Sequence, residues 1–315
     1  MTSLSITESS IPDLTGKTAV ITGGARGIGL GAVQVLLDHN ARVFVLDVLP
    51  IADDVAASKV TFIQTDTSSW LSLVDAFTAI TTEHGSKIDI AIANAGVWND
   101  PYLEDCLTPA PTDAAGWSAL KDNKPATEAC VEVNLKGTMN FVILASKVMK
   151  TQEKGGSIVV TSSSTAYFAE QQMPVYTATK AALVGLVSAL RSTLPLHKIA
   201  ISAVCPSAVE TAMIPTMFIE ALKGLGLPIA TTRHVGLALV YSATATQNRR
   251  VEDYGKDKPV PEDFEERWNG RVIHAIGEEY WEVEEKLAET RGVWWGEKNL
   301  KLTEKQRVVS DLREV

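Results

Sequence analysis

A tyrosine and a lysine stand four residues apart in the segment Tyr176-Thr-Ala-Thr-Lys180. On a helix this spacing places both side chains on one face. A free phenol, with a pKa near 10, is a poor base at neutral pH. An ammonium group about 5 Å away, in an effective dielectric of about 20, favours the phenolate by roughly 3 kcal/mol, or about two pKa units. The pair therefore predicts proton transfer by Tyr176, assisted by Lys180.

The same spacing occurs a second time, between Tyr254 and Lys258. Gly255 and Pro259 make that stretch a poor helix, so these two side chains need not meet. Because a tyrosine and a lysine reach this spacing by chance in many chains, the motif needs support from its surroundings.

A glycine-rich turn, Thr22-Gly-Gly-Ala-Arg-Gly-Ile-Gly29, follows the first apolar run of the chain and leads into a helical stretch. Glycines in such a turn let the backbone approach a pyrophosphate, whose charge the helix N-terminus favours. A glycine cluster alone could be a simple turn, but its place between a buried strand and a helix favours dinucleotide binding. We expect cofactor contacts at Gly23, Arg26, Gly27, Ile28 and Gly29.

The cofactor is expected to be NAD. Asp47 ends the second apolar run, 18 residues beyond Gly29, near the spacing at which an acid binds the adenosine ribose hydroxyls. A carboxylate there repels the 2′-phosphate of NADP, whereas Arg26 is an opposing signal because a base can attract that phosphate. Asp66, which closes the third run, is expected to bind the adenine amino group, to cap the next helix, or to do both.

Short apolar runs alternate with longer helical stretches, and this alternation positions the candidate residues. We predict seven mostly parallel, buried strands at 17–22, 42–47, 60–65, 88–93, 157–162, 199–204 and 271–276. We predict helices between them at 28–39, 70–84, 126–150, 174–194 and 233–244. Right-handed crossovers would then place helices on both faces of the sheet. The fold class is α/β, a doubly wound Rossmann fold.

The domain organisation follows from these elements. We expect one Rossmann-fold domain at 14–283, an N-terminal arm at 1–13 and a C-terminal extension at 284–315. Residues 97–125, with four prolines, are longer than a compact connection requires and are interpreted as an insertion. Adjacent exposed tryptophans are unusual on a monomer, so Trp294 and Trp295 are expected to pack on the core or on a neighbouring subunit, although a loosely attached tail is the alternative.

Composition excludes several classes of protein. The 315 residues are 45% hydrophobic and 21% charged, as in ordinary globular chains. The apolar stretch from Ala181 to Leu190 is shorter than the roughly 20 residues of a membrane span, and the first residues lack the features of a secretory signal, so we expect a cytoplasmic protein with no membrane partner. A net charge of −9 argues against nucleic-acid binding. Three cysteines and five histidines show no metal-binding spacing, so no metal is expected.

The assembled pattern resembles the short-chain dehydrogenase/reductase family, in its single-domain alcohol dehydrogenase/ketoreductase branch, over residues 14–283. The resemblance rests on the glycine-rich turn, Asn94-Ala95-Gly96, Asn134 in VNLKG, and Ser163 placed 13 residues before Tyr176. It implies that Tyr176 is the general acid/base and that Ser163 holds the substrate oxygen. It also implies that Lys180 binds the nicotinamide ribose and tunes Tyr176, while Asn134 supports a proton-relay water.

The resemblance further implies cofactor contacts beyond the glycine-rich turn, at Asp47, Asp66, Thr67, Asn94, Ala95, Gly96, Tyr176, Lys180, Pro206, Val209 and Thr211. The family usually has Pro-Gly after the sixth strand, whereas this chain has Pro206-Ser207, and serine has a narrower range of backbone angles. The geometry of that loop is therefore open. Members commonly form dimers or tetramers, so we expect a homodimer or homotetramer.

A flexible cover over the substrate is implied at 211–232, and its residues are mostly apolar. Such a cover suits an apolar ligand, because a small polar one would need convergent polar partners. The alternative is an amphipathic helix packed on the core. Aromatic residues of the insertion, Trp98, Tyr102 and Trp117, could add a second wall. The expected substrate contacts are Ser163, Tyr176, Trp98, Met213, Met217 and Phe218.

These observations predict an NAD-dependent oxidoreductase that acts on a bulky, largely apolar secondary alcohol or ketone, such as a steroid, terpenoid, polyketide or fatty-acid derivative. The alternative is a nucleotide-binding regulatory or non-redox protein that keeps the dinucleotide site. Asn134, Ser163, Tyr176 and Lys180 are all present, which favours the enzyme. The glycine spacing TGxxxGxG argues against the sugar epimerases and dehydratases of the family's longer branch.

Overall fold

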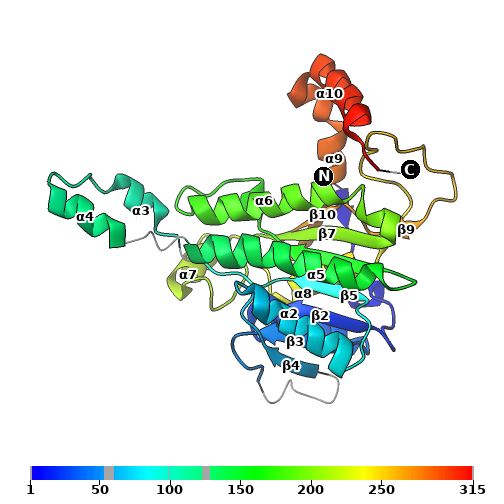
Figure 1. Cartoon of the computed structure of the whole chain (residues 1–315), viewed down its shortest axis with the longest axis horizontal. Coiled ribbons are helices and arrows are strands. Elements are labelled where there is room, and N and C mark those ends of the chain that lie inside the picture. Colours follow the sequence, from blue (N-terminus) through cyan, green and yellow to red (C-terminus); the bar gives the residue numbers. More distant parts are fainter. Residues whose placement is uncertain (1, 53–59, 99, 123–127, 314–315) are drawn as a thin grey trace.

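A twisted, mostly parallel sheet forms the centre of the molecule in a computed structural model, which describes residues 2–52, 60–98, 100–122 and 128–313 (Figure 1). The strand order is β1-β11-β10-β7-β6-β5-β2-β3-β4. Seven strands run parallel, namely β2 (Thr18–Thr22), β3 (Arg42–Asp47), β4 (Val60–Gln64), β5 (Ile90–Ala93), β6 (Gly156–Thr161), β7 (Ile199–Pro206) and β10 (Val272–Ile276). All seven predicted strands and the doubly wound α/β class are confirmed, although the strand expected to be buried at 60–65 is only half-buried, because β4 lies at the end of the sheet.

The sheet is longer than predicted because two antiparallel strands extend one edge. These are β11 (Glu279–Glu282), which pairs with β10, and β1 (Thr2–Leu4), which pairs with β11. The N-terminal arm is therefore joined to the sheet by main-chain hydrogen bonds. Neither strand has the long apolar run that marks a buried parallel strand, and the sequence analysis missed both for that reason.

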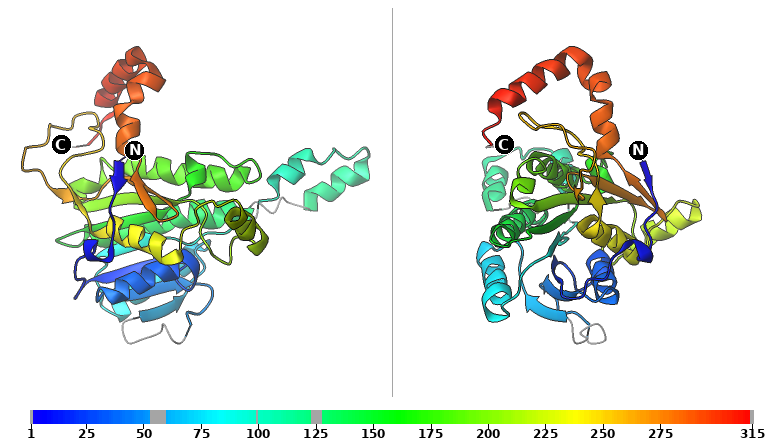
Figure 2. Two further views of the ribbon diagram at one scale, coloured as in Figure 1. Left: turned by 180° about the vertical axis from the view of Figure 1, so that it is seen from behind. Right: turned by 90° about the vertical axis from the view of Figure 1, so that its right-hand side faces the viewer.

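Helices cover both faces of the sheet and divide the core into two layers. One layer includes α1 (Gly27–Asp38) and α8 (Thr232–Thr244), which pack on each other, and the other includes α2 (Trp70–Thr78), α5 (Thr138–Lys150) and α6 (Pro174–Leu190) (Figure 2). Neighbouring strand residues alternate between these layers, as period-two geometry requires, so that Val20 joins one and Ile21 the other.

Two of the predicted helices continue through π-helical turns. The helix expected at 70–84 is α2 followed by η2 (Ala79–Glu83), and the helix expected at 126–150 contains η3 (Cys130–Gly137) followed by α5. Residues 126 and 127 lie outside the described residues. The helix expected at 174–194 ends at Leu190, and a short 3-10 turn, η5 (Leu194–His197), follows.

The chain order reverses between β2 and β5, which are neighbours in the sheet. Ligands of open α/β sheets bind beyond the carboxyl ends of the strands at such a reversal. The glycine-rich turn follows β2, and Asn94 follows β5. The topology therefore brings these two segments together at the carboxyl ends of the parallel strands.

Three segments lie outside this frame. The insertion forms α3 (Tyr102–Leu107) and α4 (Ala114–Asp122), which project from the body as an arm, while residues 99 and 123–125 lie outside the described residues (Figure 1). The expected cover contains α7 (Thr216–Gly224). The extension rises as α9 (Glu284–Glu289), turns at η6 (Gly292–Gly296) and descends as α10 (Glu297–Ser310), so that it forms an arch (Figure 2, right).

The segment between α8 and β10 forms a small separate sheet under the arch. Its two strands, β8 (Thr246–Gln247) and β9 (Glu266–Arg267), are antiparallel. Two further 3-10 turns, η1 (Glu8–Ser10) and η4 (Ser164–Ala166), complete the described elements. Within the described part of the chain, no helix is long and apolar enough to cross a membrane.

Candidate active site and cofactor site

The glycine-rich turn is closely packed against its own backbone. Gly23 has a φ of +65°, and a Cβ at Gly29 would lie 2.0 Å from the Gly23 carbonyl oxygen. Any side chain at either position would strain or displace the turn. The turn leads directly into α1. The amides of the first helical turn have no intrahelical acceptor, so a helix N-terminus favours an anion.

Asp47 lies beside this turn at the end of β3. Its buried carboxylate accepts a hydrogen bond from the Ala25 amide at 3.0 Å and one from the Leu49 amide at 3.1 Å. Arg26, by contrast, is exposed at the N-cap position of α1. The structure therefore places a fixed negative charge against the turn and a solvated positive charge at its rim.

Asp66 does not cap the following helix. Ser69 is the N-cap of α2 and accepts a hydrogen bond from the Ser72 amide at 3.3 Å, whereas the Asp66 carboxylate accepts from the Ser68 amide at 2.9 Å. The capping interpretation is therefore wrong, because the helix begins at Trp70 and Ser69 has the required spacing. Thr67 is buried, and its carbonyl lies 2.7 Å from where a Cβ on Gly137 would be.

Asn94 links three strands. Its Nδ2 donates to the Gly23 carbonyl at 3.0 Å and to the Thr22 carbonyl at 3.2 Å, and its Oδ1 accepts from the Thr161 hydroxyl at 3.2 Å. These contacts join the ends of β2, β5 and β6. The side chain thus holds together the carboxyl ends of the strands where the chain order reverses.

Asn134 and Lys180 converge on the backbone at Gly96. A Cβ on Gly96 would lie 3.3 Å from Asn134 Oδ1 and 3.5 Å from Lys180 Nζ. The Asn134 side chain is fully buried, accepts from the Val97 amide at 2.8 Å and donates to the Val97 carbonyl at 3.0 Å. Both of its polar atoms are therefore engaged with the loop after β5.

Tyr176 and Lys180 lie on one face of α6, as their spacing predicts. The Lys180 ammonium donates to the Thr161 carbonyl at 2.9 Å and lies 5.6 Å from the centre of the Tyr176 ring. Burial lowers the pKa of Lys180 to about 8, because the charged form loses water.

Burial also raises the pKa of Tyr176 to about 12, although a hydrogen bond with the Ser163 side chain acts in the opposite direction. Our expectation of a value below 10 considered the charge of Lys180 and left out this loss of water. Desolvation of the phenolate outweighs the effects that favour it, which reverses the sign of the net shift.

Ser163 begins the turn that follows β6. Its Oγ accepts from the Thr165 amide at 3.2 Å, so that it caps η4. The hydroxyl of the preceding residue, Ser162, donates to the Lys180 carbonyl at 2.8 Å. The turn that carries Ser163 is thereby joined to the helix that carries Tyr176 and Lys180.

Asp100 was not predicted from the sequence. Its carboxylate accepts from the Tyr176 amide at 2.8 Å, in the first turn of α6. The first amides of a helix have no intrahelical hydrogen-bond acceptor, so the Tyr176 amide needs an acceptor from elsewhere. Pro174, at the start of α6, has no amide hydrogen and needs none. No local signal could have identified this contact, since Asp100 precedes Tyr176 by 76 residues.

The loop after β7 crosses close to the glycine-rich turn. A Cβ on Gly27 would lie 3.6 Å from Thr211 Cγ2, and Val209 is buried next to Ala230 in an isolated parallel bridge. Ser207, where the family usually has glycine, does not adopt a positive φ, and its amide donates to the Ala275 carbonyl at 2.8 Å. Serine is therefore accommodated in this loop after Pro206 without strain.

The apolar side chains of the expected cover face solvent. Met217 is 79% exposed and Phe218 is 52% exposed, Met213 is also exposed, and in α7 only Ile219 is buried. This exposure argues against a helix simply packed on the core. Trp98 is 36% exposed, and Trp117 belongs to α4, on the arm that projects from the body (Figure 1), so the second aromatic wall stays a prediction.

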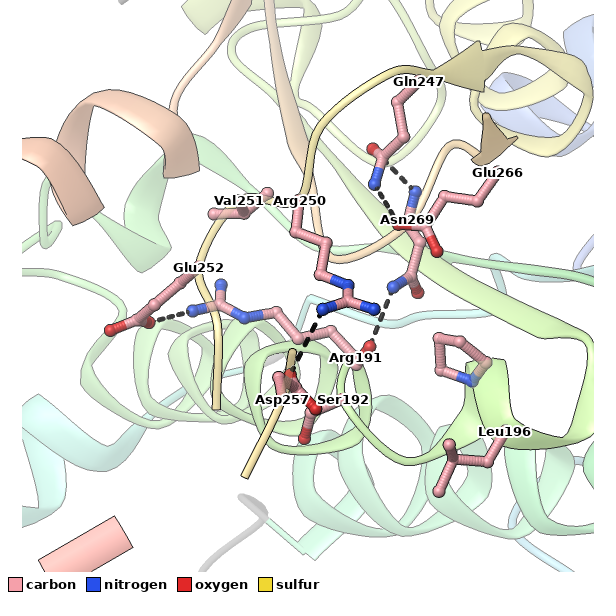
Figure 3. A pocket seen from close by; sticks show the side chains of 11 residues that line it. Arg191, Ser192, Leu196, Gln247, Arg250, Val251, Glu252, Asp257, Glu266 and Asn269 are labelled. Carbon is pink, nitrogen blue, oxygen red and sulfur yellow. Dashed lines mark hydrogen bonds and ion pairs between the residues drawn. The ribbon is translucent and has the colours of Figure 1, made fainter. Parts of the chain in front are cut away.

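Two cavities lie at the other end of α6. The smaller, of about 50 Å³, contains the ion pair between Arg191 and Glu252 at 2.5 Å (Figure 3). The larger, of about 580 Å³, lies between the end of α6 and the last residues of the extension. Among the described residues, no group of three or more His, Cys, Asp or Glu side chains is placed to hold a metal ion.

Comparison with known proteins gives consistent relatives. The sequence model of the short chain dehydrogenase family matches residues 17–220. The short-chain dehydrogenase/reductase prx4 of Penicillium rubens is 46% identical over 314 residues, which cover 99% of this chain and 90% of that protein. The short-chain dehydrogenase/reductase ATR7 of Stachybotrys chlorohalonatus is 40% identical over 324 residues, which cover 99% of this chain and 95% of that protein.

Solved structures show the same architecture. A short-chain type dehydrogenase/reductase from Mycobacterium marinum is 25% identical with a TM-score of 0.63, over 76% of this chain and 92% of that one. A 3-ketoacyl-(acyl-carrier-protein) reductase from Brucella melitensis, complexed with NADH, is 23% identical with a TM-score of 0.60, over 73% of this chain and 91% of that one. The second likeness concerns the fold alone.

Proposed function

The chain belongs to the short-chain dehydrogenase/reductase family, and we propose that it is an NAD-dependent enzyme that oxidises a bulky, largely apolar secondary alcohol or reduces the corresponding ketone. Members of this family bind NAD or NADP. The observation that carries the proposal is the convergence of Asn134 and Lys180 at Gly96, with Tyr176 and Ser163 joined to the same assembly.

The residues of the site fit a nicotinamide cofactor. The glycine-rich turn leaves no room for side chains next to the N-terminus of α1, and Thr211 lies over the same turn. The Asp47 carboxylate supplies hydrogen-bond acceptors for ribose hydroxyls and repels a 2′-phosphate, which supports NAD. Bound NAD would supply the hydride acceptor for oxidation of the carbinol carbon.

The chain's own residues handle the proton. Tyr176 takes the hydroxyl proton of the alcohol through its phenolic oxygen, and Ser163 holds the substrate oxygen by a hydrogen bond. Lys180, with a pKa of about 8, is mostly charged at pH 7 and stabilises the phenolate of Tyr176. In the direction of reduction, Tyr176 returns the proton to the oxygen.

The apolar cover supports the proposed class of substrate. Exposed Met213, Met217 and Phe218 lose contact with water when an apolar ligand lies against them. Screening the purified protein with NAD against secondary alcohols of increasing size tests this. We expect kcat/KM to rise as apolar bulk is added beside the carbinol, and a small charged hydroxy acid as the best substrate would contradict the proposal.

Replacing Tyr176 tests the chemistry. The Tyr176→Phe variant removes one hydroxyl, so NADH binding should persist while turnover falls at least about a hundredfold, as expected for loss of an acid/base group. Tyr254→Phe is the matched control, because the Tyr254 ring lies against Arg307 and Arg313 at the far end of α6. NADH binding without turnover on any alcohol or ketone would instead indicate a nucleotide-binding protein without redox activity.

A further inference from the structure

A carboxylate of the C-terminal extension contacts the turn that carries Ser163. Glu284, the first residue of α9, is only 7% exposed. Its Oε1 accepts a hydrogen bond from the Tyr167 hydroxyl at 2.5 Å. Tyr167 follows Ser163 by four residues, at the end of η4. A hydrogen bond to a buried carboxylate is among the stronger ones in proteins, so this contact holds the end of the turn.

The turn between Ser163 and Tyr167 is tight, and it has two attachments. The Ala166 amide donates to the Ser163 carbonyl at 3.0 Å, and the Tyr167 amide donates to the Ser164 carbonyl at 3.0 Å. The beginning of the turn is attached to α6 through the Ser162 hydroxyl. The end is attached to the extension through Tyr167. Tyr167 and Ser163 are therefore joined by one short, hydrogen-bonded turn.

The second oxygen of Glu284 is bound to the far end of α6. Oε2 accepts from Arg191 Nη1 at 3.1 Å and from the Ser188 hydroxyl at 3.3 Å. Arg191 also pairs with Glu252, as Figure 3 shows. Glu252 in turn pairs with Arg291 at 3.0 Å and with Arg307 at 2.7 Å, both in the extension. Both oxygens of the Glu284 carboxylate therefore accept hydrogen bonds, and Arg191 balances its charge.

The Tyr167 hydroxyl stays a donor over the working pH range. Burial and the charge of Glu284 both raise the pKa of Tyr167 far above its ordinary value.

We propose that Glu284 is a positioning residue for proton transfer, which acts through the Tyr167 hydroxyl on the turn that carries Ser163, and this inference rests on the proposed function. The extension is then part of the active-site structure, although it lies beyond residues 17–220 that match the family. Ser163 and Tyr176 must be held in a narrow geometry for the reaction, and small misplacements reduce turnover strongly.

The test compares Tyr167→Phe and Glu284→Gln with the wild-type protein. Tyr167→Phe removes the hydroxyl and keeps the ring, so the fold is preserved. We expect kcat for the best alcohol of the panel to fall about tenfold in both variants, while the KM for NAD stays within about twofold, because the glycine-rich turn is untouched. Hydrogen exchange of the peptide containing residues 163–168 should become faster in both.

Glu285→Gln is the matched control. Glu285 is also buried in the extension, but its carboxylate contacts Arg249 and Arg271 instead of the serine turn. This variant should lower thermal stability and leave kcat and exchange of the 163–168 peptide unchanged. Unchanged kcat in Tyr167→Phe, or an equal loss in Glu285→Gln, would overturn the inference.

Failure of the proposed function is distinguishable from failure of this inference. A wild-type protein that turns over no alcohol or ketone would refute the function, and hydrogen exchange would then decide the anchoring alone. Faster exchange of the 163–168 peptide in Tyr167→Phe, with no change in Glu285→Gln, would still support the anchor. No difference between these variants would refute it.

Discussion

The amine of Lys180 is titratable and buried away from water. It donates a hydrogen bond to the Thr161 carbonyl. The pKa of about 8 means that folding makes this lysine release its proton more readily than the unfolded chain does. Protonation and stability are therefore linked at this residue. The same buried position gives the amine its effect on Tyr176, since a charge acts more strongly where solvent is excluded.

Lys180 predicts a rise in stability with pH. Below pH 8 the amine is charged in both states and the cost of burial is fully present. Between about pH 8 and 10.5 the unfolded chain binds more protons, so the free energy of unfolding rises, by about 3 kcal/mol at most. Urea unfolding between pH 7.5 and 9.5 should show this rise in the wild type and not in Lys180→Met. Parallel curves for the two proteins would contradict it.

The charge of Asp47 leads us to expect a preference for NAD over NADP. Its charge should repel the 2′-phosphate of NADP, so kcat/KM with NAD should be at least about tenfold higher, a difference of about 1.4 kcal/mol. Asp47→Asn removes the charge while its side-chain oxygen can still accept from the Ala25 amide, so the preference should narrow without loss of the turn. Arg26→Ala is the matched control, and equal use of NADP by the wild type would show that Arg26 dominates.

At the residue scale, motifs predicted the residue types of the site but not their environment. Asn134, Ser163, Tyr176 and Lys180 were predicted from the family motifs in which they stand, because the Tyr-Lys spacing alone is common. The sign of the Tyr176 shift was wrong, since a sequence gives no measure of burial. Asp100 and Glu284 were missed because their partners are far away in the chain, and long-range polar contacts leave no periodic pattern.

The elements show why some parts were predicted and others were not. Continuous apolar runs identified all seven parallel strands, because six of them are mostly buried, whereas β4, at the end of the sheet, is only half-buried. The short edge strands β1 and β11 contain polar residues and pair only because the fold brings them together. The five helices predicted between the strands are found with shifted ends or π-helical turns, whereas α3, α4, α7, α9 and α10 were not predicted.

Asp100 connects two elements, the insertion and α6. Asp100→Ala removes the acceptor for the Tyr176 amide, so stability should fall by about 1 kcal/mol, as for the loss of a helix cap, and kcat should fall because Tyr176 is in that first turn. Thermal unfolding and steady-state kinetics measure the two effects. Asp113→Ala is the matched control, since Asp113 accepts from the Gly116 amide at 2.7 Å within the insertion. Equal kcat in both variants would separate Asp100 from the chemistry.

At the scale of the whole molecule, the extension is tied to the body at both ends. Its first residue reaches the serine turn, and near its end Asp311 accepts from the Lys256 amide at 2.9 Å while Arg313 pairs with Asp257 at 2.9 Å. These contacts explain why the extension forms an arch over the loop between α8 and β10 (Figure 2, right). A loosely attached tail is inconsistent with so many fixed contacts.

The arch leaves its tryptophans uncovered. Trp294 is 57% exposed and Trp295 is 49% exposed, and the two rings pack edge to face on each other. The expectation that they pack on the core is therefore wrong, because both residues lie in η6, at the turn of the arch, where they stay exposed. Packing on a neighbouring subunit is the alternative that the sequence analysis left open, and exposed aromatic pairs of this kind are typical of interfaces.

Removing residues 293–315 tests both roles of the arch. Glu284 and Arg291 remain, but Glu252 loses Arg307 and Asp257 loses Arg313, so the thermal midpoint should fall by several degrees, since 1 kcal/mol corresponds to about 2 °C or more in a protein of this size. If the wild-type protein is the expected homodimer or homotetramer and the tryptophans lie in its interface, light scattering should show a smaller assembly for the truncated protein. The double variant Trp294→Ala, Trp295→Ala keeps the ion pairs, so it should lose mass while its midpoint changes less. If the mass is unchanged in both proteins, the tryptophans do not lie in a subunit interface. If the thermal midpoint is unchanged on truncation, the ion pairs of the arch contribute no stability.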